Sequence, residues 1–294
     1  MWVRVRVPAS TANLGPGFDA LGLALALYDE VEVAPAASGL RVEVHGEGAG
    51  QVPTDEDNLV VRALRAACAR CGHQPDGVVL RCRNRIPHSR GLGSSAAAAV
   101  AGVLAGYALA GMEPEEAALD LAAGFDGHAD NVGASLLGGV VISWKDGRSF
   151  RATRLEPHPD LAPVLFVPEQ TSATEVTRSL LPADVPHGDA AFTAGRAALL
   201  VHALTKAPRL LLAATEDRLH QPYRRSAYPA TGRLLDVLRD AGVPAAVSGA
   251  GPTVLALPVG GELPGQLGPG RDITAGFIRY RLDVARRGAV IERG

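Results

Sequence analysis

A glycine-rich segment that ends in two serines offers the clearest chemistry in this chain of 294 residues. It opens a long alanine-rich stretch and consists of Pro87, His88, Ser89, Arg90, Gly91, Leu92, Gly93, Ser94, Ser95, Ala96 and Ala97. The two glycines let the backbone approach a ligand closely, and Ser94 or Ser95 falls at or near the N-cap of a helix. Free amides of the first turn and the helix dipole favour an anion such as a phosphate. The alternative is an ordinary capped helix after a glycine turn.

The scarcity of lysine limits how this loop can bind a phosphate. Only Lys145 and Lys206 are lysines among the 29 basic residues, and neither lies near the loop. A Walker A loop needs a lysine after its last glycine, whereas Gly93 is followed by Ser94. The glycine spacing does not match a Rossmann fingerprint either. Phosphate charge must therefore be met by helix amides, Mg²⁺ and arginine.

The glycine loop resembles the P-x-x-x-G-L-G-S-S-A-A phosphate loop of the GHMP small-molecule kinases. Residues 8–19, PASTANLGPGFD, are similar to the N-terminal motif of the homoserine kinase family within that superfamily. Residues 247–253, VSGAGPT, resemble the third glycine motif, and His128-Ala129-Asp130-Asn131 lies between the motifs in family order. The resemblance implies ATP-dependent phosphorylation of L-homoserine to O-phospho-L-homoserine, a step of threonine biosynthesis.

For ATP, the resemblance implies contacts along the whole loop from Pro87 to Ala97 and a base contact from Asn58. The alternative role of Asn58 is to cap the helix that follows it. Mg²⁺ prefers hard oxygen ligands and keeps several waters, so one hydroxyl and one carboxylate are enough. We expect Ser94 rather than Ser95 to supply the hydroxyl.

The carboxylate for Mg²⁺ is where the chain departs from the family. Asp126, in Phe125-Asp126-Gly127-His128, stands where the family usually has Glu. The side chain is one methylene shorter, which leaves direct and water-bridged coordination both open. Asp120 is the alternative ligand, although it also fits an exposed helix face.

A zwitterionic substrate with a hydroxyl group needs a carboxylate near its ammonium and arginine near its carboxylate. By resemblance, the substrate-binding residues are Asn13, Asp19, His128, Asp130, Arg178, Arg224 and Gly249. Arg178 and Arg224 match family arginines, and Arg218 and Arg225 are neighbours that could be confused with Arg224.

The residues expected at the reacting hydroxyl are Asn131, His128 and Asp130. Phosphoryl transfer through a dissociative transition state needs little help from a base, so positioning can supply most of the rate. We expect direct in-line transfer, with Asn131 and His128 orienting the hydroxyl and His128 acting as a hydrogen-bond donor. Whether Asp130 acts as a base stays open.

The composition of the chain argues against some classes of binding partner. A net charge of −2 without a basic cluster argues against nucleic acid. The N-terminus alternates apolar and charged residues and has no signal-peptide block, which indicates a cytoplasmic protein. Residues 91–112 carry no charge over a length that could span a bilayer, but their Ala, Gly and Ser content favours a buried helix and no membrane partner. A homodimer is expected from the family.

The three cysteines leave two alternatives. Cys68, Cys71 and Cys82, with His73, could be assembled into a zinc site. However, Cys68 and Cys71 continue the helical spacing of Val61 and Leu64, which favours one apolar helix face. We therefore expect core cysteines.

The elements that must position these residues mix strands and helices without regular βα alternation, which predicts an α+β fold. Strands are expected at residues 3–7, 21–33, 40–45, 78–85, 140–144, 151–155, 164–167, 245–248, 254–257, 272–281 and 289–292. Helices are expected at residues 58–71, 92–110, 114–123, 174–181, 189–203 and 231–240. The resemblance implies the two-domain GHMP kinase architecture, with an N-terminal ribosomal-protein-S5-like domain at residues 1–155 and a C-terminal ferredoxin-like domain at residues 156–294.

Two rival functions remain open. Another GHMP kinase, of the mevalonate or galactose type, would share the loop but should lack the motif of residues 8–19. A non-catalytic nucleotide-binding regulator is the other, and the replacement at Asp126 is its only support.

Overall fold

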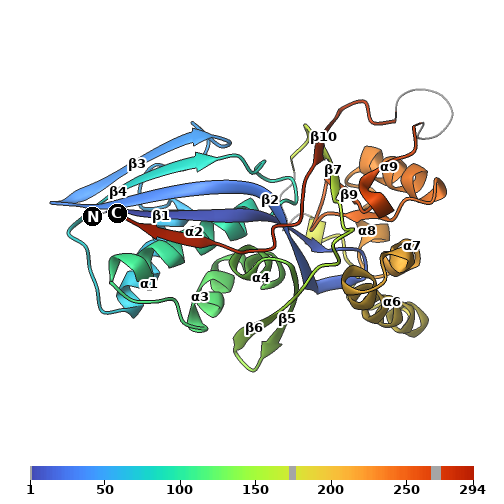
Figure 1. Ribbon diagram of the computed structural model, residues 1–294, viewed down its shortest axis with the longest axis horizontal. Helices are drawn as coiled ribbons and strands as arrows, with labels where there is room; N and C mark the ends of the chain where they lie inside the picture. Colours follow the sequence, from blue (N-terminus) through green and yellow to red (C-terminus); the bar gives the residue numbers. More distant parts are fainter. Residues whose placement is uncertain (1, 172–176, 266–272) are drawn as a thin grey trace.

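The structure is a computed structural model that describes residues 2–171, 177–265 and 273–294. Its strands and helices form two sheet-based layers placed end to end (Figure 1). The strands are β1 (Val3–Asn13), β2 (Gly17–Ala36), β3 (Gly39–Gly46), β4 (Gly77–Asn84), β5 (Val140–Asp146), β6 (Ser149–Leu155), β7 (Val164–Pro168), β8 (Ala245–Val247), β9 (Val254–Ala256), β10 (Phe277–Arg281) and β11 (Val290–Arg293). The helices are α1 (Leu59–Arg70), α2 (Ser94–Leu109), α3 (Ala117–Asp126), α4 (Asp130–Leu137), α6 (His187–Thr205), α7 (Leu211–Ala214), α8 (Gln221–Arg224) and α9 (Pro229–Asp240), with short 3₁₀ turns at Pro208–Leu210 and Val259–Gly261.

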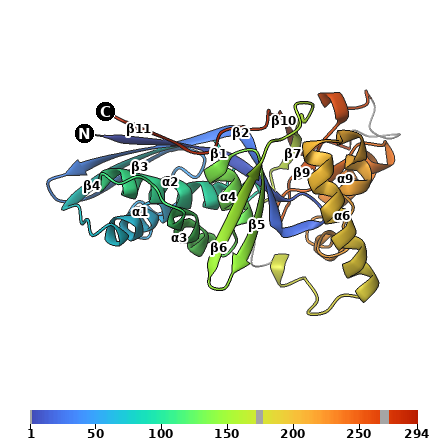
Figure 2. The same ribbon diagram turned by 60° about the horizontal axis from the view of Figure 1, so that its bottom comes forward.

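The first sheet is built around the long antiparallel pair β1 and β2, in the order β11-β1-β2-β4-β3. Val3, Val5 and Val7 are fully buried, as their alternation with arginines predicts. The C-terminal part of β2 pairs with β4, and its N-terminal part, at Leu21–Leu23, pairs with β5. β5 in turn forms an antiparallel hairpin with β6. This sheet therefore extends toward the second layer along β1, β2 and the hairpin (Figure 2).

Helices α1 to α4 cover one face of the first sheet, and α2 lies innermost. α2 contacts α1, α3, α4 and β1, which explains why it is buried along most of its length. A Cβ atom at Gly102 would lie 2.4 Å from the carbonyl oxygen of Val60, so glycine lets α1 and α2 pack closely. In the described part of the chain, no helix has the length and apolar character needed to cross a membrane.

The second sheet has the antiparallel order β10-β7-β9-β8. Val164 and Phe166 of β7 belong to one apolar cluster with Leu234 and Leu238 of α9. The intervening residues of β7 belong instead to the main core. Because both faces of β7 are buried, its sequence is continuously apolar rather than alternating.

Most predicted elements are confirmed with small changes at their ends. Helices α4, α7 and α8 were not predicted from sequence, and each is eight residues long or shorter. The predicted helix at 174–181 falls partly outside the described residues. Cys68 on α1 and Cys82 on β4 are buried, as expected of core cysteines, whereas Cys71 is the C-cap residue of α1 and is only partly buried.

Candidate active site

Ser248 joins the three sequence motifs at one point. Its hydroxyl donates a hydrogen bond to the carbonyl oxygen of Gly91 (2.6 Å) and lies 2.8 Å from the hydroxyl of Thr11. The backbone amide of Gly249 donates to the carbonyl oxygen of Ala12 (3.0 Å). The N-terminal motif, the phosphate loop and the third glycine motif therefore form a single site, although they are far apart in sequence.

The loop before α2 leaves the N-terminus of that helix without a side-chain cap. The N-cap is Gly93, with a φ of 68°, so the serines lie one and two positions later than a capping serine would. A Cβ at Gly93 would lie 2.0 Å from Oγ of Ser10, and at Gly91 it would lie 2.2 Å from the carbonyl oxygen of Ser248. An uncapped first turn at the end of a tight glycine loop suits a phosphate group.

Arg90 has a different role from the one expected of a loop arginine. Its guanidinium donates to the carbonyl oxygens of Pro168 (2.9 Å), His88 (3.0 Å) and Glu169 (2.9 Å). The side chain thus holds the loop against the end of β7 rather than presenting its charge to a phosphate.

A cavity of about 250 Å³ lies beside the loop and the start of α2. Its lining combines apolar residues with polar ones. The apolar residues include Val31, Val44, Val52 and Leu59, and the polar residues include Asn58, His88, Ser89, Ser94 and Ser95. A cavity with a mixed apolar and polar lining suits a ligand that has both an apolar ring and polar groups. Six of the twelve residues predicted to contact ATP line this space: Asn58, His88, Ser89, Ser94, Ser95 and Ala97.

Asn58 caps α1, as its alternative role predicts. Its Oδ1 accepts from the amides of Val60 (3.0 Å) and Val61 (3.4 Å), and its Nδ2 donates to the carbonyl oxygen of Pro53 (2.8 Å). One amide hydrogen of Nδ2 is left for another partner. The base contact stays a prediction.

Asp29 is a buried residue of this cavity that the sequence analysis missed. Its carboxylate accepts from the amides of Arg85 (2.6 Å) and Ile86 (2.9 Å), directly before the loop. Burial raises the pKa of Asp29 to about 6. The available signal was its position in β2, because it shares the inward face of that strand with Val31 and Val33.

Asp126 lies close to the start of α2. Its carboxylate accepts a hydrogen bond from Ser95, and its pKa is raised by burial, against the opposing effects of His128 and Ser95. No cluster of three acidic, histidine or cysteine side chains suited to a metal occurs within the described residues. A carboxylate beside a serine hydroxyl nevertheless fits Mg²⁺, which needs few protein ligands when phosphates supply others. Asp120 instead accepts from the amide of Phe150 (2.8 Å) and braces the β5–β6 hairpin.

The His128–Asn131 segment turns into α4. Nδ1 of His128 lies 3.1 Å from the carbonyl oxygen of Asp126 and must carry a proton to bond it, which leaves Nε2 as the acceptor of a neutral ring. Oδ1 of Asn131 accepts from the hydroxyl of Ser10 (2.9 Å). Oδ1 of Asp130 accepts from the amide of Asn131 (2.7 Å), and burial raises the pKa of Asp130 to about 7.

Four of the predicted substrate-binding residues form one hydrogen-bonded network. Oδ1 of Asn13 accepts from the amide of Asp19 (3.0 Å), and its Nδ2 donates to the carbonyl oxygen of Gly249 (2.8 Å). Arg178 donates from Nη2 to Oδ1 of Asp19 (2.7 Å). The network brings an acid, an arginine, an amide and a glycine carbonyl together from both sequence halves.

Arg224 is the buried cation of this site. Only 2% of it is exposed, and its Nη1 contacts neutral partners, Nδ1 of His220 (3.0 Å) and the carbonyl oxygen of Gly249 (3.4 Å). It forms no ion pair with any described carboxylate, and its Nε has no partner there. Burial and the nearby charge of Arg178 lower its pKa. Asp19 and Asp217 lie near enough to offset part of this effect, but neither carboxylate is hydrogen-bonded to Arg224. A buried guanidinium without a hydrogen-bonded carboxylate is costly, so the site is suited to an anionic group.

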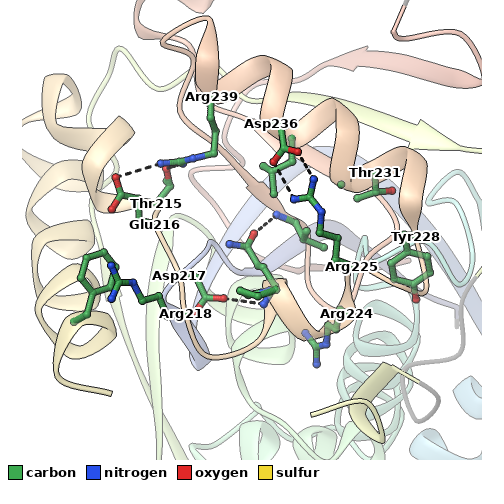
Figure 3. Close-up of a pocket in the computed structure, with 16 residues that line it drawn as sticks. Thr215, Glu216, Asp217, Arg218, Arg224, Arg225, Tyr228, Thr231, Asp236 and Arg239 are labelled. Atoms are coloured by element: carbon green, nitrogen blue, oxygen red, sulfur yellow. Dashed lines mark hydrogen bonds and ion pairs between the residues drawn. The ribbon is translucent and has the colours of Figure 1, made fainter. Parts of the chain in front are cut away.

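The neighbouring arginines are distinguished from Arg224 by their ion pairs. Arg225 pairs with Asp236 on α9, and Arg218 pairs with Asp189 (3.1 Å). Figure 3 shows Arg225 directed toward Asp236 and Arg224 directed to the other side of α8. Arg224 is therefore the member of the trio that reaches the carbonyl oxygen of Gly249, which also accepts from Asn13.

Comparisons with known proteins identify the family and the fold of the chain. Residues 58–139 match the GHMP kinase N-terminal domain, and residues 196–260 match the GHMP kinase C-terminal domain. The chain is 56% identical to the homoserine kinase of Streptomyces avermitilis, over 87% of this chain and 85% of that protein. It is 53% identical to the homoserine kinase of Rhodococcus erythropolis, again over 87% and 85%. The crystal structure of homoserine kinase from Cytophaga hutchinsonii superposes with a TM-score of 0.84 at 26% identity, over 99% of this chain and 97% of that one. The expected two-domain architecture is confirmed.

Proposed function

The chain belongs to the homoserine kinase family of the GHMP kinases, and on this premise we propose that it transfers the γ-phosphoryl group of ATP to the hydroxyl of L-homoserine. The product is O-phospho-L-homoserine, an intermediate of threonine biosynthesis. The buried guanidinium of Arg224, which has only neutral partners, is the observation that carries the substrate assignment. It lies in one network with a carboxylate, as the two charges of an α-amino acid require.

In this proposal the amino acid is bound by groups of opposite sign. Arg224 and Arg178 bind its carboxylate, and Asp19 binds its ammonium group. Asn13 and the carbonyl of Gly249 complete the site through hydrogen bonds. The carboxylate of the bound amino acid would be the hydrogen-bonded anion that Arg224 lacks. This one contact would therefore contribute both to the affinity for homoserine and to the selection of an amino acid.

The nucleotide binds with its phosphates at the start of α2 and its base in the adjacent cavity. Support comes from the uncapped first turn and the mixed lining of that cavity. Asp126 and Ser94 would hold Mg²⁺, with Ser95 hydrogen-bonded to Asp126. Bound there, Mg²⁺ supplies positive charge that neutralises the phosphates.

The transfer itself is direct and in line, with Asn131 and His128 orienting the hydroxyl. Ser10 fixes the amide of Asn131. Because Nδ1–H of His128 is engaged by the carbonyl of Asp126, a neutral His128 orients the hydroxyl by accepting its hydrogen bond at Nε2. The donor role expected from sequence requires the imidazolium form instead. If Asp130→Asn abolishes turnover but leaves homoserine binding intact, Asp130 acts as the base.

The deciding experiment measures ADP release with homoserine, mevalonate, galactose or no acceptor. We expect release that depends on Mg²⁺ and on homoserine, with the other acceptors at the background level. ADP release without dependence on homoserine would overturn the substrate. ATP binding without turnover on any acceptor would favour the regulator.

The proposal also covers the domain boundaries, the cellular location and the oligomeric state. The first domain comprises residues 1–155 and the second residues 156–294, with the closing strand β11 returning to pair with β1 in the first sheet. The protein acts in the cytoplasm. It forms a homodimer, as expected from the family, which sedimentation can test.

A further inference from the structure

We propose that His220 is a positioning residue for the amino-acid substrate, which holds Arg224 and the loop after Asn13 in their binding geometry. The proposal rests on the function proposed above and concerns the same site. His220 lies directly before α8 and is fully buried. It was not among the residues expected from sequence.

Both ring nitrogens of His220 have partners of opposite kinds. Nε2 lies 2.8 Å from the carbonyl oxygen of Gly15, and Nδ1 lies 3.0 Å from Nη1 of Arg224. A carbonyl only accepts and a guanidinium only donates, so Nε2 carries the proton and Nδ1 carries the lone pair. Burial lowers the pKa of His220, and the charge of Arg224 acts in the same direction. Asp217, whose Oδ2 lies 3.6 Å from Nε2, opposes them, but the net direction is downward, which agrees with a neutral ring. This tautomer joins an acceptor to a donor across one rigid ring.

The ring is itself held in place from several sides. Phe18 stacks on it at a centroid distance of 5.2 Å. The carboxylate of Asp217 accepts from the amides of His220 (3.0 Å) and Gln221 (2.8 Å) and so fixes the start of α8. Figure 3 shows Asp217 at this turn, with Arg225 and Asp236 bracing the opposite side of α8. A ring constrained in this way can position its partners.

The loop on the other side of His220 needs such support. Asn13, Leu14 and Gly15 have positive φ angles of 66°, 53° and 93°, which are unfavourable for the two non-glycine residues. Asn13 in this loop hydrogen-bonds both Asp19 and Gly249. The bond from Nε2 to Gly15 therefore fixes the loop that carries Asn13, while Nδ1 fixes Arg224. Both effects concern homoserine, and neither reaches the phosphate loop directly.

Two substitutions of His220 each remove one of its two hydrogen bonds and keep the other. In His220→Asn the shorter amide oxygen can take the place of Nδ1 and accept from Arg224, but the side chain does not reach Gly15. In His220→Gln the longer amide can donate to Gly15, but the acceptor for Arg224 is lost. A lost hydrogen bond to a charged group corresponds to a change of about 10- to 100-fold. We expect His220→Gln to raise the KM for homoserine by about that factor, with kcat and the KM for ATP changed less than about twofold.

His220→Asn should give a homoserine KM between those of His220→Gln and the wild type, because it restores the acceptor for Arg224 but still lacks the bond to Gly15. In the background of Arg224→Met, His220→Gln should cause little further increase. The matched control is His158→Gln, which alters a histidine of the second half that accepts from the amide of Asp160 (3.2 Å) and should leave all constants unchanged.

Three outcomes would overturn the positioning role. They are a parallel rise in the KM for ATP, an unchanged homoserine KM in His220→Gln, or full additivity with Arg224→Met. If the variants do not fold, ¹⁵N spectra of the histidine-labelled wild-type protein still test it: a protonated ring or the Nδ1–H tautomer at neutral pH would contradict it. Absence of homoserine-dependent turnover in the wild type would instead reject the proposed function, which separates the two failures.

Discussion

The two ends of the proposed active site use different groups: the phosphate end is built mainly from backbone, and the amino-acid end mainly from side chains. The phosphate end, from Pro87 to the first turn of α2, consists of backbone amides, glycines in positive φ and an uncapped helix end. The amino-acid end consists of charged and amide side chains, brought together from Asn13, Asp19, Arg178 and Arg224. Ser248 lies between them and contacts the phosphate loop and the N-terminal motif.

This difference determines what each end tolerates. A site made of backbone is disturbed by atoms that are added, because a Cβ changes φ preferences and fills the space. A site made of charged side chains is disturbed by atoms that are removed, because a buried partner is then left unpaired. The phosphate end should therefore fail on gain of a methyl group and the amino-acid end on loss of a charge.

The largest effect is expected from Gly91→Ala. Gly91 has a φ of 76°, and a Cβ there would lie 2.2 Å from the carbonyl oxygen of Ser248. Strain and overlap with backbone should lower kcat/KM for ATP by at least about 100-fold. Steady-state kinetics, with thermal unfolding to report folding, measure it. The matched control is Gly124→Ala, since a Cβ at Gly124 meets nothing within 4 Å. Near-normal ATP kinetics in Gly91→Ala would contradict the backbone account of this end.

The second effect, on the amino-acid end, is expected from Arg224→Met. The thioether keeps most of the apolar volume and removes the guanidinium, so homoserine should lose charge-assisted hydrogen bonds and its KM should rise by about 100-fold. The KM for ATP should change little. Homoserine titration calorimetry provides an independent measurement. Arg225→Met is the control, because that arginine faces Asp236 instead. Equal losses in the two variants would show that charge near α8 matters in general and that Arg224 is not specific.

The two ends also differ in how far sequence could predict them. The phosphate loop is contiguous and lies between a strand and a helix with clear periodicity, so its elements and its ligand class follow from local patterns. The partners of His220 and Asp29 could not be found in this way, because Gly15 and Ile86 lie 205 and 57 residues away from them. The alternation of β2 marks Asp29 as an inward residue but does not say what it binds. Their residue types are common, and only the fold creates their contacts. The short helix α4 escaped for a related reason, because eight residues with a glycine carry little periodic signal.

Ser248→Ala tests the connection between the two ends. It removes the hydroxyl that donates to the carbonyl of Gly91 and meets Thr11. One buried hydrogen bond contributes about 1 kcal/mol, and an unpaired carbonyl adds to the loss, so about a tenfold fall in kcat/KM is expected. Because Ser248 touches both ends, the KM for ATP and that for homoserine should both rise. Ser149→Ala, in the distant β5–β6 hairpin, is a control. A change confined to one substrate would show that the ends are independent.

The smallest effect on catalysis, and the one that separates stability from activity, is expected from Asp29→Asn. The asparagine keeps Oδ1 as an acceptor for the amides of Arg85 and Ile86, so kcat/KM should change less than about twofold. What should change is the pH dependence of the free energy of unfolding. The pKa of Asp29 is about 6 in the folded protein against an ordinary value of 3.8, because burial disfavours the charged form.

The sign follows from proton binding. Between about pH 4 and pH 6 the folded protein holds this proton more tightly than the unfolded chain, so the contribution of Asp29 to stability falls as pH rises and is constant above that range. A difference of about two pKa units sets an upper limit of about 3 kcal/mol. The amide introduced by Asp29→Asn cannot titrate, so the variant should gain stability relative to wild type as pH increases from about 4 to about 7, measured by urea unfolding at each pH. A gap that narrows with rising pH would mean that the two amide hydrogen bonds outweigh burial and lower this pKa. In that case the phosphate end would depend on a side-chain charge as the amino-acid end does, and the contrast between them would fail at this residue.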